Sequence, residues 1–123
     1  MASDGPGGRL TTHVLDTMSG KPARGVRIVL KGLDGAVEDV SLERVTNDDG
    51  RCDAPLLSGD ALRTGTYELT FHVGDYFRAI GVELSDPAFL DAVPVRFGLH
   101  DADSHYHVPL LISPYGYSTY RGS

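Results

Sequence analysis

Apolar residues recur at every second position over most of this chain, and this period constrains the fold more than any other feature. Alternation of this kind is typical of β-strands with one buried face, whereas a helix would show a period of 3.6 residues. The predicted strands are rich in β-branched and aromatic residues and are separated by Gly, Pro, Asn and Asp. They span Leu10–Leu15, Val26–Leu33, Val40–Thr46, Thr66–Val73, Val93–Leu99, Tyr106–Ile112 and Tyr115–Tyr120. We therefore predict an all-β sandwich.

Two glycine-bearing segments mark turns between these strands. The segment MSGKPARG supplies a glycine suited to positive φ and a bend set by proline, and NDDG ends in the glycine that a tight hairpin or a bulge favours. One short helix is predicted in GDYFRAIGV, which starts at Gly74. A chain of 123 residues has the length of one domain. We place that domain at Arg9–Ser123, after a disordered tail over Met1–Gly8.

The charge of the chain argues against anionic partners. It has 11 basic and 17 acidic residues, a formal net charge of −6, and no basic cluster. Nucleic acids and anionic membrane surfaces are therefore disfavoured as partners. Its apolar runs, such as Val108–Ile112, are far shorter than the roughly 20 residues of a bilayer span, and the start MASDGPGG lacks the apolar region of a signal peptide. We expect a soluble, cytoplasmic protein.

Cys52 is the single cysteine of the chain. One thiol excludes an internal disulfide and a zinc site with several thiolates, and it fits a reducing compartment. We interpret Cys52 as a small, inert residue of the core or of an interface. A nucleophilic cysteine is the alternative.

The chain has five histidines, the residues most suited to carry chemistry, and the segment HDADSHYH at His100–His107 contains three of them. Crowded Asp and His residues first suggest a metal site. An EF-hand that started at Asp101, however, would need glycine in place of Tyr106 and glutamate in place of Ile112. We therefore predict no metal and no cofactor. The plainer alternative is a hydrated turn followed by a functional or half-buried histidine.

Strand alternation assigns these residues to faces. In HYHVPLLIS the core face would hold Tyr106, Val108, Leu110 and Ile112, and the other face would hold His107, Pro109 and Leu111. Other outward faces are similar: Thr11, His13 and Leu15 share one, and Ser118 and Tyr120 share another. Apolar residues beside histidine or tyrosine on an outer face indicate a subunit interface that contains a polar site.

Three segments carry a resemblance to a known family. LTTHVLDTMSGKPARGVRIVL, TNDDGR and HYHVPLLISPYGYSTYRGS resemble the transthyretin-related 5-hydroxyisourate hydrolases from about Leu10 to Ser123, and the terminal YRGS is the most specific of these motifs. The resemblance implies a transthyretin-like two-sheet sandwich of about eight strands with one short helix. It implies a homotetramer with its sites at the dimer–dimer interface. The implied reaction belongs to urate degradation: it opens the ring amide of 5-hydroxyisourate to give 2-oxo-4-hydroxy-4-carboxy-5-ureidoimidazoline.

The resemblance also implies which residues form the site. The family's histidines fall on His13 and His107, its arginine falls on Arg51, and its terminal tyrosine and arginine fall on Tyr120 and Arg121. We add Ser118 to the substrate-binding residues because it shares a strand face with Tyr120. The alternative function is that of a transthyretin-like small-ligand carrier or binding module. Transthyretin itself lacks these histidines and the YRGS end.

Elementary chemistry agrees with this set of residues. Opening a cyclic amide needs a water deprotonated near neutral pH, a group that stabilises the oxyanion, and an oriented substrate. An arginine beside a histidine disfavours the imidazolium form and keeps the ring basic. We assign His107 as the base, with His13 and Arg51 binding and polarising the substrate, although the two histidines could exchange roles. Arg121 would place a positive charge near His107 or brace a neighbouring subunit, and the Ser123 carboxylate could pair with it.

Overall fold

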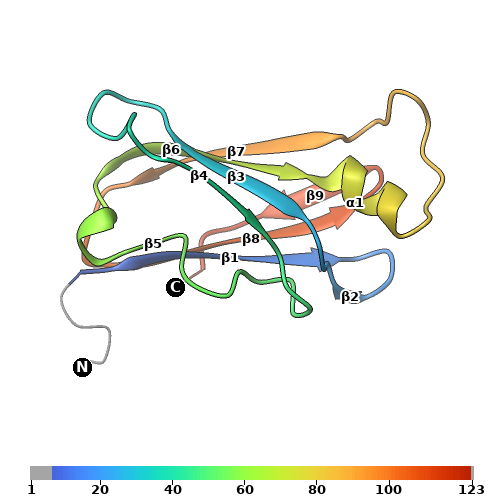
Figure 1. Cartoon of the computed structure of the whole chain (residues 1–123), viewed down its shortest axis with the longest axis horizontal. Coiled ribbons are helices and arrows are strands. Elements are labelled where there is room, and N and C mark those ends of the chain that lie inside the picture. The colour runs from blue at the N-terminus through green and yellow to red at the C-terminus, as the bar shows by residue number, and fades with distance from the viewer. Residues whose placement is uncertain (1–6, 123) are drawn as a thin grey trace.

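Two β-sheets packed face to face form the protein (Figure 1). The structure is a computed structural model and describes residues 7–122. One sheet has the order β2-β1-β8-β9, with β5 paired to β1, and the other has the order β4-β3-β6-β7. The strands of the first sheet are β1 (Arg9–Asp16), β2 (Lys21–Pro22), β5 (Leu57–Ser58), β8 (His105–Ser113) and β9 (Gly116–Thr119). Those of the second are β3 (Arg27–Gly32), β4 (Ser41–Val45), β6 (Gly65–His72) and β7 (Ala92–Leu99). The predicted all-β sandwich is confirmed.

The seven strands predicted from alternation are all present, and each boundary lies within one residue of the prediction. Two further strands, β2 and β5, were not predicted because a two-residue strand shows no period. The predicted helix is α1 (Val73–Ala79), which ends before Gly81 at φ +90°. A 3₁₀ turn, η1 (Gly59–Ala61), lies between β5 and β6. No helix within residues 7–122 has the length and apolar character needed to cross a membrane.

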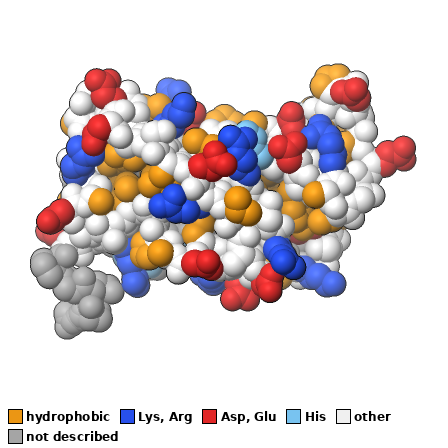
Figure 2. Space-filling model, in the orientation of Figure 1, with side chains coloured by type: hydrophobic (Ala, Val, Ile, Leu, Met, Phe, Trp, Pro, Cys, Tyr) orange, Lys and Arg blue, Asp and Glu red, His pale blue; other side chains and the backbone are white. Residues whose placement is uncertain are grey.

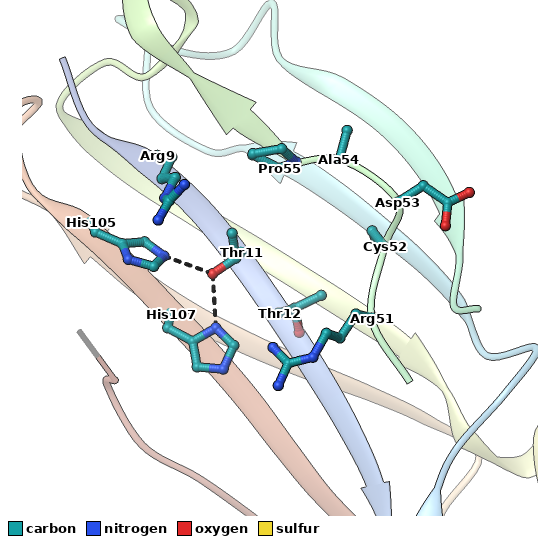
Figure 3. A pocket seen from close by; sticks show the side chains of 10 residues that line it. All are labelled: Arg9, Thr11, Thr12, Arg51, Cys52, Asp53, Ala54, Pro55, His105 and His107. Atoms are coloured by element: carbon teal, nitrogen blue, oxygen red, sulfur yellow. Dashed lines mark hydrogen bonds between the residues drawn. The ribbon is translucent and has the colours of Figure 1, made fainter. Parts of the chain in front are cut away.

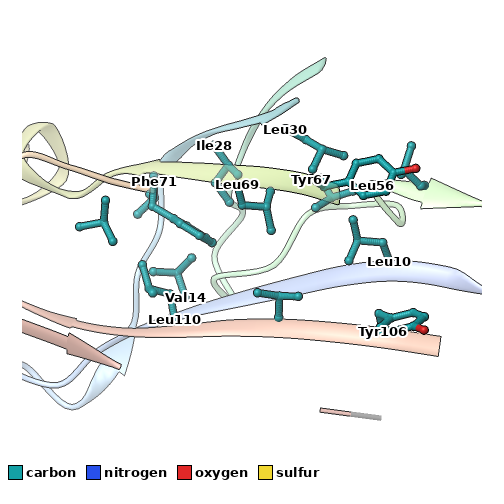
Figure 4. Close-up of a cluster of buried hydrophobic side chains, with 14 of the residues drawn as sticks. Leu10, Val14, Ile28, Leu30, Leu56, Tyr67, Leu69, Phe71, Tyr106 and Leu110 are labelled. Carbon is teal, nitrogen blue, oxygen red and sulfur yellow. The ribbon is translucent and has the colours of Figure 1, made fainter. Parts of the chain in front are cut away.

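The core lies between the two sheets. In β8 the buried residues include Tyr106, Val108, Leu110 and Ile112, which confirms the predicted core face. Figure 4 shows Phe71, Leu69 and Tyr67 facing Val14 and Leu10 across the sandwich. Since apolar side chains from both sheets fill this space, the opposite face of β1 and β8 remains available for polar chemistry.

A buried carboxylate fixes the turn after β1. Asp16 is 1% exposed, and its Oδ1 accepts hydrogen bonds from the backbone N–H groups of Met18 and Ser19. Its Oδ2 accepts a 2.9 Å hydrogen bond from the hydroxyl of Tyr76 in α1. Burial, and then this bond to Asp16, raise the pKa of Tyr76 to about 12. Asp16 therefore has a structural role: it ties the helix to the β1–β2 turn.

The first and last long strands of the chain are neighbours. β1 pairs with β8 in parallel, with Thr11 opposite His107 and His13 opposite Pro109. This pairing brings together residues that are more than 90 positions apart in the sequence. The predicted disordered tail, residues 1–8, lies largely outside the described residues. Gly8 is described and buried, and its N–H donates a 2.8 Å hydrogen bond to the carbonyl of Ala102.

Candidate active site

A cavity of about 420 Å³ opens on the outer face of the β1–β8 pair (Figure 3). Strands β1 and β8 supply its floor, and the segment that leads from β4 to β5 supplies one wall. The lining residues are Arg9, Thr11, Thr12, Arg51, Cys52, Asp53, Ala54, Pro55, His105 and His107. Two of the predicted catalytic residues, Arg51 and His107, therefore share one pocket.

His107 projects from β8 on the face opposite the core. Its Nδ1 lies 2.8 Å from Oγ1 of Thr11, so Nε2 is the ring nitrogen left for a ligand. Burial lowers the pKa of His107, and the nearby Arg51, His105 and His13 lower it further. The ring is therefore kept neutral to a lower pH than an ordinary imidazole, which suits a group that must accept a proton.

His13 lies on β1 beside the loop that carries Arg51, and the two residues form an isolated backbone bridge. Its Nε2 lies 2.8 Å from the carbonyl oxygen of Asp49. A carbonyl oxygen can only accept, so Nε2 of His13 carries the hydrogen and Nδ1 carries the lone pair. Burial lowers the pKa of His13, and Arg51 is the second cause. His13 is not among the residues that line the pocket of Arg51 and His107, so it is less well placed than His107 to act as the base.

The NDDG turn aims Arg51 at the pocket. Oδ1 of Asn47 accepts hydrogen bonds from the backbone N–H groups of Asp49 and Arg51, and the Gly50 N–H donates to the Asn47 carbonyl at 2.9 Å. Gly50 has φ +75°, a conformation that glycine adopts without strain. The Gly50 carbonyl accepts a 2.8 Å bond from the Val14 N–H, which anchors the turn to β1. The predicted role of this glycine is confirmed.

The chain end is attached to the backbone of His107. The Gly122 N–H donates to the His107 carbonyl at 2.7 Å, and the His107 N–H donates to the Gly122 carbonyl at 3.3 Å. The C-terminal segment therefore forms a two-bond bridge at the predicted base. Ser123, whose carboxylate was predicted to pair with an arginine, lies outside the described residues.

Three of the predicted binding residues lie elsewhere in the described chain. The guanidinium carbon of Arg121 lies 4.4 Å from the centre of the Tyr106 ring, a cation–π arrangement. Arg121 and Tyr120 line a separate groove with residues of β7 and β8, and the Tyr120 side chain is 60% exposed. Ser118 is exposed on β9, opposite Leu111. Within a single chain these three residues do not reach the pocket of His107 and Arg51.

The segment HDADSHYH forms a turn and then a strand, in agreement with the alternative of a turn followed by a functional or half-buried histidine. Asp101 Oδ1 accepts from the Asp103 N–H, and its Oδ2 accepts a 2.6 Å bond from the Ser104 hydroxyl. Residues 7–122 contain no group of three or more His, Cys, Asp or Glu side chains that could hold a metal ion.

Sequence reasoning assigned no role to several residues of this pocket, chiefly Thr11, His105 and Arg9. Alternation could have identified them, because Arg9 and Thr11 share a face of β1 with His13, and His105 shares a face of β8 with His107. Cys52 also lines the pocket. Burial raises the pKa of the Cys52 thiol, so it is a poor source of thiolate.

Comparisons with known proteins show which family and which solved structures the chain is similar to. The family model described as the HIUase/Transthyretin family matches residues 10–122. A relative from Rhizobium meliloti (strain 1021), named 5-hydroxyisourate hydrolase 2, is 65% identical over 94% of this chain and 97% of its own length. Among solved structures, Klebsiella pneumoniae 5-hydroxyisourate hydrolase is 37% identical with a TM-score of 0.75, and covers 94% of each chain. The crystal structure of an (S)-allantoin synthase is 46% identical with a TM-score of 0.90; it covers all of this chain, which spans 46% of that protein.

Proposed function

The chain belongs to the HIUase/transthyretin family, and we propose that it is an enzyme that hydrolyses the ring amide of 5-hydroxyisourate. One observation carries the proposal: a histidine whose pKa is lowered and an arginine share a pocket in a chain that is 65% identical to a protein named 5-hydroxyisourate hydrolase 2. That near full-length identity favours the hydrolase over a transthyretin-like carrier. The reaction would belong to urate degradation.

His107 is the proposed base. Its Nδ1 faces Thr11, which leaves Nε2 to accept a proton from water. The water oxygen then adds to the ring carbonyl carbon of the substrate, the C–N bond breaks, and the proton held on Nε2 passes to the leaving nitrogen. A base whose pKa is lowered by burial and by Arg51 is unprotonated at neutral pH, as this step requires.

Arg51 is the proposed electrostatic partner of the substrate. Its guanidinium carries a permanent charge and five N–H donors in a planar fork, which can hold a polar heterocycle or stabilise the oxyanion of the tetrahedral intermediate. His13 lies beside Arg51 with Nδ1 as its acceptor, and we assign it to substrate binding and orientation. None of these steps requires a metal or a cofactor.

We further propose a cytoplasmic homotetramer in which a second subunit covers the pocket face. That face combines Leu15, Pro109 and Leu111 with the site histidines, and apolar residues around a polar site are typical of an interface. Tyr120, Ser118 and Arg121 would complete the site of a neighbouring subunit rather than that of their own. This assignment would give a role to side chains that lie outside the pocket of a single chain.

The test is the decay of ultraviolet absorbance of freshly made 5-hydroxyisourate, followed with and without the protein. We expect strong acceleration over the spontaneous rate, and no change after treatment with a chelator. A decay equal to the blank would contradict the function. Activity that is lost on chelation and restored by zinc would contradict the metal-free mechanism.

A further inference from the structure

The hydroxyl of Thr11 lies between two imidazole rings in the pocket. Thr11 Oγ1 is 2.8 Å from Nδ1 of His107 and 2.9 Å from Nε2 of His105. Figure 3 shows the two rings directed at this hydroxyl from neighbouring positions on β8. The three side chains meet because β1 and β8 pair in parallel, with Arg9 opposite His105 and Thr11 opposite His107. The hydroxyl therefore links the proposed base to a second histidine.

The number of hydrogens limits how these groups can bond. A hydroxyl has one hydrogen, so Thr11 can donate to only one of the two rings. Two arrangements use the hydroxyl both as donor and as acceptor. In the first, Nδ1–H of His107 donates to Thr11, and Thr11 donates to Nε2 of His105. In the second, Nε2–H of His105 donates to Thr11, and Thr11 donates to Nδ1 of His107. Neutral His107 then carries its hydrogen on Nε2, so this nitrogen cannot accept a proton from water.

The charges around the rings favour the first arrangement. Among the described residues, the charged or titratable side chains that line the pocket or act on His107 are Arg9 and His13 from β1 and Arg51, Cys52 and Asp53 from the segment between β4 and β5. Cationic groups predominate among them, and a nearby positive charge favours a lone pair over an N–H on the ring nitrogen that faces it. Nε2 is the nitrogen of His107 that Thr11 leaves open to the pocket, whose lining includes the guanidinium groups of Arg9 and Arg51.

We infer that Thr11 and His105 are positioning residues that hold neutral His107 as its Nδ1–H tautomer, with the lone pair on Nε2. The catalytic use of that lone pair rests on the proposed function, whereas the tautomer does not. Once Nε2 has taken the proton from water, Nδ1–H remains bonded to Thr11, whose own hydrogen remains bonded to His105. The link thus serves the ring before and after proton transfer. This arrangement resembles the way a carboxylate orients the histidine of a catalytic triad, but it uses a neutral acceptor.

Long-range ¹H–¹⁵N correlation spectra of protein labelled with ¹⁵N-histidine test the tautomer directly. Above the pKa of His107, we expect the pattern of an Nδ1–H imidazole in the wild type and in Thr11→Ser, which keeps the hydroxyl. Thr11→Val keeps the shape and the β-propensity but has no acceptor, so the Nδ1–H preference should be lost. A wild-type His107 with its hydrogen on Nε2, or a Thr11→Val variant that keeps the Nδ1–H pattern, would overturn the inference.

Kinetics supply a second, independent measurement. Thr11→Val should lower kcat by about 10- to 100-fold, the loss seen when the hydrogen-bond partner of a metal-ligating histidine is removed, with KM nearly unchanged. His105→Leu should act in the same direction, and His105→Gln, whose side-chain oxygen can accept from Thr11, should recover part of the loss. Equal rates for the Leu and Gln variants would overturn the role of His105. If the wild type failed to hydrolyse 5-hydroxyisourate, the proposed function would fall, and the spectra would still decide the tautomer.

Discussion

At the scale of single residues, the proposed chemistry depends on a histidine that is kept neutral. The pKa of His107 is lowered first by burial and then by the charge of Arg51, and the pKa of His13 is lowered by the same two causes. Both effects act against the imidazolium form, so each ring stays neutral below the pH at which an ordinary histidine gains its proton. The state required of a base is therefore already present in the free protein.

The pH dependence of the rate follows from this shift. The hydrolysis rate should stay level as the pH falls from 8 to about 6.5, the ordinary pKa of histidine, and should decline only below that value. The unfolded chain binds more protons than the folded one in this lower range, so the free energy of unfolding should also fall there. Initial rates at each pH, with circular dichroism on the same samples, separate the two effects. A midpoint of activity above 6.5 would contradict a base with a lowered pKa.

The charge of Arg51 can be tested apart from the burial of His107. In Arg51→Gln the pKa of His107 should rise, but it should remain below the ordinary value because burial, the larger cause, persists. Arg51→Lys keeps a positive charge and serves as the control, with a pKa of His107 near that of the wild type. Histidine resonances followed by NMR during a pH titration report both values. An unchanged pKa in Arg51→Gln would show that Arg51 does not act on the ring.

At the scale of elements, a turn and the chain end hold the site together. Gly50 has φ +75°, and a Cβ there would collide with the carbonyl oxygen of Val14. Gly50→Ala should therefore lose more stability than the about 1–3 kcal/mol of backbone strain alone. Gly25→Ala is the matched control, since Gly25 has φ +81° and open space around it. Urea unfolding measures both variants, and equal losses would show that the contact with Val14 costs nothing.

The C-terminal segment also supports the site, through the backbone bridge between Gly122 and His107. Deletion of Arg121–Ser123 should leave a folded sandwich, because the core strands lie upstream, but it should remove most of the activity. The reason is that both backbone bonds between Gly122 and His107 are lost. Arg121→Ala separates the two contributions of this segment, because it keeps the bridge and removes only the side chain that contacts Tyr106 and that we propose for a neighbouring subunit's site. A truncated protein with full activity and unchanged assembly would show that the terminal residues are only a tail.

The strands and their core faces were easier to predict from the sequence than the contacts between side chains. Alternation in a segment such as HYHVPLLIS assigns a strand and its core face because burial of one face imposes the period. The contact of Thr11 with His105 and His107 could not be predicted from the sequence. It depends on the parallel register of β1 and β8, and the alternation of apolar residues does not specify that register. The stacking of Arg121 on Tyr106 was not predicted either, because it depends on the path of the segment after β9 along β8. The family resemblance assigned Arg51 and His107 to one site, and the two residues do share a pocket.

At the scale of the whole molecule, the surface combines mixed charges with exposed aromatic residues. On the face drawn in Figure 2, acidic and basic side chains of the described residues are interspersed. Exposed aromatics are more unusual: Phe89 and Tyr115 are each 70% exposed, with ring centres 6.0 Å apart, and Tyr120 is 60% exposed. Large apolar groups left in water by one chain are typical of surfaces that a neighbouring subunit covers.

Tyr120 tests the proposed tetramer and its pocket together. In the proposed tetramer we place this ring against its symmetry partner in a channel between the subunits, which it would narrow to shallow pockets that fit a small heterocycle. Tyr120→Thr should therefore lower the hydrolysis rate and raise the affinity for bulky aromatic ligands, which titration calorimetry measures. Light scattering should give the mass of four 13.2 kDa chains for the wild type and the variant. A variant with no gain in ligand binding would contradict the role of Tyr120 as a plug, and a monomeric wild type would contradict the assembly.

The rate at which 5-hydroxyisourate decays with wild-type protein and with His107→Asn, measured side by side, tests the proposed chemistry most directly. Asparagine is smaller than histidine and keeps an amide, but it cannot take a proton from water. The wild type should accelerate the decay strongly, and the variant should fold normally and lose about 10²- to 10⁴-fold in rate. A folded His107→Asn protein that hydrolysed the substrate as fast as the wild type would contradict the assignment of His107 as the base.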